Sequence, residues 1–96
     1  MLGNSTLPDG LKFTKKTKVF DAETVPQGLQ KAHQIALGTW GLLRVLEGEL
    51  RFVLEDSGES RVLRAGDAQV VEPGVSHHVE LEPGARFFIE FHRPES

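Results

Sequence analysis

Cysteine is absent from this 96-residue chain, so disulfides, thiolate metal sites and cysteine nucleophiles are excluded. An excess of positive charge is also absent. The net charge is −3, which gives no electrostatic reason to expect a nucleic acid or an anionic membrane as partner. No window approaches the roughly 18 consecutive apolar residues of a membrane span, and the N-terminus lacks the basic and apolar regions of a secretory signal. We therefore expect a cytoplasmic protein.

The length and composition fit one small soluble domain, because 39% of the residues are hydrophobic and 26% are charged. Residues 1–10 are rich in turn-forming and flexible residues, and this predicts a mobile N-terminal arm. Residues 11–96 then make up the predicted domain. A chain of this size has only a thin core, so we expect a homodimer that buries further apolar surface.

Short β-type segments separated by turns fill the rest of the chain. Residues 11–20 carry Lys15, Lys16 and Lys18, which predicts an edge strand protected from pairing with other chains. Residues 39–48 and 49–56 predict a hairpin with Glu47 and Gly48 in its tight turn. Further strands are predicted over residues 61–66, 68–72, 77–82 and 86–93. No helical pattern exceeds about two turns, so we predict an all-β sandwich or barrel.

The stretch from Gly66 to His77 resembles the second conserved motif of the cupin superfamily. Gly66, Gly74 and His77 stand at the family spacing, whereas Glu72 holds the position of the family's proline. The resemblance implies a cupin-like jelly-roll β-barrel.

A narrower resemblance covers about residues 25–92. It is carried by Pro26 to Leu29, His33, Gly38 to Gly41, Leu46 to Glu49, Glu72 and Pro73, His77, and Phe88 to Phe91. These segments resemble the small stand-alone cupin domain of the TehB/YeaR-like, tellurite-resistance-associated type. That family implies a bound divalent metal in some members, and some relatives are fused to a methyltransferase. The chain has no glycine-rich nucleotide loop, so methyl transfer is not expected of it.

The usual cupin metal ligands are absent. The resemblance places the first-motif ligands near Ile35, Leu37 and Gly41, none of which can coordinate a metal. A replacement set comprises His33, Glu47, His77, Glu90 and His92. Three of these could converge at a barrel mouth and hold zinc, iron, nickel or manganese with an open position. Each also has a plainer interpretation, such as a histidine bonded to a turn carbonyl or a glutamate facing water.

Trp40, Arg44 and Phe88 are candidate pocket residues. Core or interface packing is the alternative for Trp40, core packing for Phe88 and a salt bridge to a nearby glutamate for Arg44.

Three functions remain open from the sequence. The first is a binding protein for a divalent metal, a small molecule or an oxyanion. The second is a metal-dependent enzyme, such as a small dioxygenase or isomerase, that uses a metal-bound water. The third is a metal-free module that binds a partner.

Overall fold

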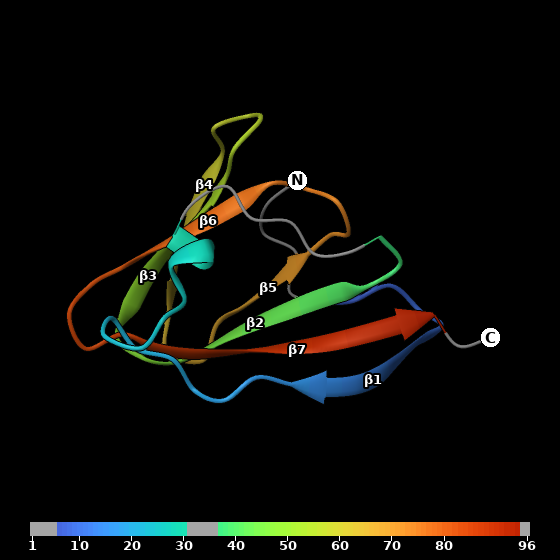
Figure 1. The fold of residues 1–96 in the computed structure, drawn as a ribbon, viewed down its shortest axis with the longest axis horizontal. Coiled ribbons are helices and arrows are strands. Elements are labelled where there is room, and N and C mark those ends of the chain that lie inside the picture. The colour runs from blue at the N-terminus through green and yellow to red at the C-terminus, as the bar shows by residue number, and fades with distance from the viewer. Residues whose placement is uncertain (1–5, 31–36, 95–96) are drawn as a thin grey trace.

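Two antiparallel sheets form the molecule in the computed structural model, which describes residues 6–30 and 37–94 (Figure 1). The first sheet has the strand order β1-β7-β2-β5, and the second has the order β4-β3-β6. The bounds are β1 Leu11–Lys16, β2 Trp40–Glu47, β3 Glu49–Leu54, β4 Ser60–Arg64, β5 Ala68–Val71, β6 His77–Leu81 and β7 Arg86–Pro94. A 3-10 helix, η1 (Gln27–Gln30), lies beside β6. The all-β prediction is confirmed.

The core lies between the two sheets because alternate residues of each strand point inward. Phe87 and Ile89 of β7 face it from the first sheet, and Leu50 and Phe52 of β3 face it from the second. Phe52 and Phe87 are fully buried. Burying one such side chain stabilises the fold by about 1.5–3 kcal/mol, so this two-residue alternation holds the sheets together.

The predicted hairpin between residues 39–48 and 49–56 is wrong. β2 pairs with β5 and β7, whereas β3 pairs with β4 and β6. Gly48 therefore carries the chain from one sheet to the other, with φ 71°. A tight glycine turn between two alternating segments is compatible with both arrangements, so the local pattern could not decide between them.

A second link between the sheets lies on the side of β4 and β5. The guanidinium of Arg61 on β4 donates hydrogen bonds to the Gln69 side-chain oxygen at 2.9 Å and to the Ala68 carbonyl at 3.1 Å. Gln69 is buried on β5. A charge-assisted hydrogen bond of this kind holds two strands that are not paired with each other.

The edge-strand prediction is confirmed for residues 11–16, because β7 is the one strand that pairs with β1 among the described residues, whereas residues 17–20 lie beyond the strand. The register shifts between Phe13 and Lys15, as in a β-bulge. After this shift Lys15 lies over the ring of Phe91 and Lys16 lies over the ring of Phe88. The side chains of Lys15 and Lys16 therefore lie on opposite faces of the sheet.

Two further expectations concern the chain as a whole. Residues 1–5 of the predicted arm lie outside the described residues, so the arm stays a prediction, as does the homodimer. Among the residues described, no helix combines the length and apolar character needed to cross a membrane.

The corner at Gly48 gives a stability prediction. A Cβ at Gly48 would lie 2.8 Å from the Ala85 Cα and 2.9 Å from the Ala85 nitrogen, whereas a Cβ at Gly58 (φ 75°) would meet nothing within 4 Å. Gly48→Ala should therefore cost about 3 kcal/mol or more, since backbone must shift in addition to the left-handed strain. Gly58→Ala should cost about 1 kcal/mol, from the strain alone. Urea unfolding measures both, and equal losses would contradict the close contact.

Candidate functional site: an apolar pocket beside His77

A pocket of about 210 Å³ opens between η1, β6 and β7. Its lining consists of Thr17, Phe20, Pro26, Gly28, Leu29, His77, Ile89 and Phe91. Phe20, Leu29, His77 and Ile89 are buried, and the other four are exposed or half-buried at the rim. The pocket is therefore an apolar hollow with one buried polar ring, an arrangement typical of small-molecule sites.

His77 begins β6, two residues after the Pro-Gly turn. The residue is 2% exposed, and its ring stacks on Phe52 with the ring centres 5.2 Å apart and the planes at 23°. Nδ1 lies 3.1 Å from the carbonyl oxygen of Val75. When Nδ1–H donates to this carbonyl, the neutral ring has Nε2 as its acceptor atom. The turn and the stack together fix the orientation of the imidazole.

The chain segment from Phe20 to Val25 brings the other wall of the pocket into place. Phe20 pairs with Phe87 through backbone bonds of 2.7 and 3.0 Å and contacts its ring. Asp21 then accepts bonds from the amides of Glu23 and Thr24, both at 2.9 Å. These bonds, with the Thr24 hydroxyl, hold the pKa of Asp21 below its usual value. All three bonds go to one carboxylate oxygen, Oδ1, and hold it against its own turn.

A polar cluster occupies the outer face of the first sheet. Glu90 accepts a hydrogen bond from the Arg44 guanidinium at 2.8 Å and lies 3.2 Å from Nε2 of His92. Burial acts to raise the pKa of Glu90, but the bonds from His92 and Arg44 outweigh it and hold that pKa below its usual value. The salt-bridge interpretation of Arg44 is confirmed.

The predicted metal ligands are distributed over different parts of the fold. Glu90 and His92 lie together, but they face away from the core, whereas His77 faces into it. Glu47 pairs with Arg86 at 2.6 Å, at the end of β2. His33 lies outside the described residues. Within residues 6–30 and 37–94, no group of three or more histidine or acidic side chains could hold a metal ion, so these residues alone do not supply the predicted set.

The predicted pocket residues lie apart from the hollow beside His77. Arg44 and Phe88 lie on the outer face of the first sheet. There the Lys16 ammonium lies over the Phe88 ring. Trp40 is half-buried and pairs with His92 in the register of β2 and β7. None of the three lines the pocket described above.

Sequence reasoning missed Thr17, Phe20, Leu29 and Ile89 as pocket residues. One signal was present, because Ile89 alternates with Glu90 on the last strand and so shares the inner face with Phe87. The contribution of Phe20 and Leu29 depends on how the loop and η1 fold back, and no short-range pattern encodes that.

His78 forms a separate ionic group on the outer face of the second sheet. Its Nδ1 contacts the Glu55 carboxylate, and Nε2 lies 2.8 Å from Glu80. Carboxylates only accept, so both ring nitrogens donate when the ring is charged. The bond to Glu80 raises the pKa of His78, burial opposes this, and Glu55 raises the pKa further. Arg51 approaches Glu80 at 3.8 Å.

This group predicts a pH-dependent stability. The folded pKa of His78 lies above its unfolded value of about 6.5, so its stabilisation is complete below that pH and is lost as the pH rises through the folded pKa. We expect a loss of about 1 kcal/mol or less, because the partners are partly exposed. Urea unfolding from about pH 5.5 to 8.5 should show a step in the wild type that His78→Gln lacks. An identical pH profile for the two proteins would contradict the assignment.

Comparison with known proteins places this geometry in a family. A family model of the TehB-like domain matches residues 15–89. Over 71 residues the chain is 34% identical to the probable S-adenosyl-L-methionine-dependent methyltransferase TehB of Haemophilus influenzae, covering 69% of this chain and 25% of that protein.

Two solved structures share the fold. The crystal structure of TehB from Haemophilus influenzae superimposes with a TM-score of 0.79 at 28% identity, covering 90% of this chain and 32% of that one. A crystal structure of a protein from E. coli (strain K12) gives a TM-score of 0.87 at 20% identity, covering 95% and 98% of the two chains. The chain thus spans about a quarter to a third of the TehB proteins it matches, and nearly the whole E. coli chain.

Proposed function

The chain belongs to the TehB-like domain family, and from this premise and the pocket beside His77 we propose that it is a binding module for a small, mainly apolar molecule. The single observation that carries the proposal is the buried imidazole on the wall of an otherwise apolar hollow. Methyl transfer is not part of the proposal, because the matched region is only 25% of the protein that bears that name.

The size of the pocket limits the ligand. Its volume of about 210 Å³ exceeds the roughly 150 Å³ of an engineered protein cavity that holds benzene, and falls below the pockets of drug-sized ligands. A molecule of about one ring therefore fits. Apolar contact with Phe20, Leu29 and Ile89 supplies the affinity, and the His77 ring adds one polar side chain to the wall.

A strongly hydrated inorganic oxyanion is a poor match for this lining. Removing water from a charged group is costly unless several donors replace it, and the described lining offers the imidazole and the Thr17 hydroxyl as its polar side chains. The Thr17 oxygen already accepts from the Ile89 amide at 3.1 Å and donates to the Lys18 carbonyl at 2.8 Å. The geometry thus favours an organic ligand.

Phenol is a suitable first probe, because it is a single ring with one hydroxyl. In an NMR titration it should shift the methyl signals of Leu29 and Ile89, with an affinity on the order of millimolar for so few atoms. The methyl groups of Leu42 and Val70 are the internal control, since both residues are buried but neither lines the pocket. Equal shifts in both pairs, or none at Leu29 and Ile89, would contradict the proposal.

The metal prediction has its own test. It depends on His77 together with His33, which lies outside the described residues. If these histidines hold a divalent ion, elemental analysis of the purified protein should find zinc, iron, nickel or manganese, and His77→Ala should remove it. Retention of the metal in His77→Ala would assign it to other residues.

A further inference from the structure

We infer that the natural ligand is a small aromatic or aliphatic carboxylate, whose charged group lies at the pocket mouth beside Lys15. This inference rests on the proposed function and adds the charge of the ligand. The inference is based on the contact between Lys15 and Phe91. Phe91 lines the pocket, and the Lys15 ammonium lies over the Phe91 ring.

Lys15 is placed by the bulge in β1. The Lys15 Nζ lies 5.9 Å from the centre of the Phe91 ring. Thr17, two residues along, lines the same pocket and is held by its amide bond of 2.9 Å to the Ile89 carbonyl. Residues two apart in an extended segment share a face, so Lys15 and Thr17 lie on the pocket side of the strand.

The charges around the mouth favour an anion. The described lining contains no carboxylate. Asp21 and the exposed Glu23 are the carboxylates of the adjoining turn, where Asp21 is bonded to two amides, and Glu90 is paired with Arg44 on the opposite face of the sheet. Four exposed lysines, in contrast, follow one another along this edge of the first sheet: Lys12, Lys15, Lys16 and Lys18.

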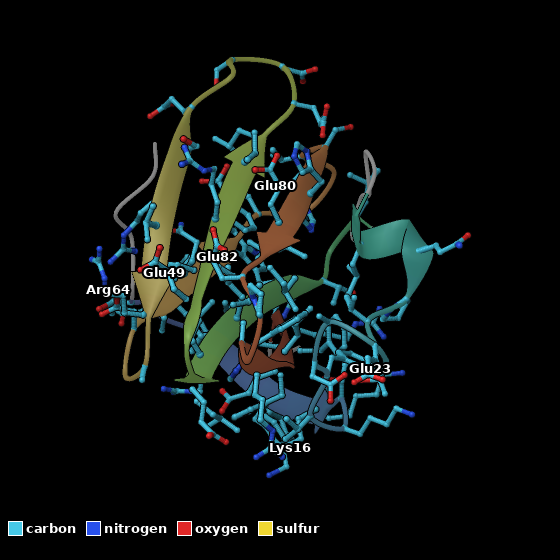
Figure 2. All side chains as sticks on the ribbon, turned by 90° about the vertical axis from the view of Figure 1, so that its left-hand side faces the viewer. Lys16, Glu23, Glu49, Arg64, Glu80 and Glu82 are labelled. Atoms are coloured by element: carbon cyan, nitrogen blue, oxygen red, sulfur yellow. The ribbon has the colours of Figure 1, made fainter. Side chains whose placement is uncertain are left out.

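Several acidic residues gather away from the pocket. Figure 2 shows Glu49, Glu80 and Glu82 on the side of the second sheet, whereas Glu23 and Lys16 lie on the side of the first sheet. Arg51 and Arg64 offset only part of that acidic surface. The lysines of β1 thus lie on the side of the pocket, and this acidic surface does not.

An amphipathic acid satisfies both parts of the site. Its apolar body displaces water from the hollow, while its carboxylate stays at the exposed rim and keeps most of its hydration. This arrangement avoids the cost of burying a charge. An exposed ion pair between Lys15 and the ligand carboxylate contributes roughly a two- to fivefold gain in affinity. The charge therefore selects among ligands that the apolar pocket already binds.

The test compares 4-hydroxybenzoate with 4-hydroxybenzamide, which are similar in shape and differ in charge. NMR titration of the wild-type protein at low salt should show the benzoate binding about two- to fivefold more tightly. Lys15→Gln should abolish that preference. Lys16→Gln is the matched control, because its ammonium lies 5.5 Å from the centre of the Phe88 ring, on the other face, and the preference should persist. Raising the salt to about 1 M should also reduce it, since exposed charges are screened.

The experiment distinguishes a failure of the carboxylate inference from a failure of the proposed binding function. Equal binding of the two compounds, with shifts at Leu29 and Ile89, would overturn the carboxylate inference and leave the binding pocket in place. Equal losses in Lys15→Gln and Lys16→Gln would also overturn it, because the preference would then come from the general positive field. If neither compound shifts Leu29 or Ile89, both the inference and the proposed function are wrong.

Discussion

The alternation of side chains along β7 is the constraint on which the candidate site depends. Phe87, Ile89 and Phe91 face inward, where they complete the core and one wall of the pocket, while Phe88 and Glu90 face outward. A strand gives each residue one face only. Side chains of the two sets therefore cannot meet in one cavity, however close they are in sequence.

The same constraint explains how far the sequence could predict the structure. The strands, the lysine-rich edge and the two faces of the last strand follow from short-range patterns, and each agrees with the structure. The connection between β2 and β3 could not be predicted from such patterns. A glycine turn such as Gly48 is compatible with a hairpin and equally with a change of sheet. Which strands pair is decided by contacts between distant residues, such as the backbone of Ala85 against Gly48.

The site was predicted less completely than the fold. His77 was identified through its motif spacing, and it does lie at a cavity, but its neighbours are Phe20 and Leu29 rather than other described histidines. Those neighbours arrive through a loop and a short 3-10 turn, whose path depends on the Asp21 turn and on the bridge between Phe20 and Phe87. Apolar residues in such a loop look like ordinary core residues until their partners are known.

The position of β7 also bears on how the domain is made. β7 is the last described strand, yet it lies between β1 and β2, and β1 has no other strand partner among the described residues. The first sheet therefore cannot be completed until β7 has been synthesised. Until then, β1 lacks the strand with which it pairs in the folded domain. Such distant pairings slow the search for the native state. The candidate pocket thus forms only after β7 has joined the first sheet, because Ile89 and Phe91 of β7 supply part of its wall.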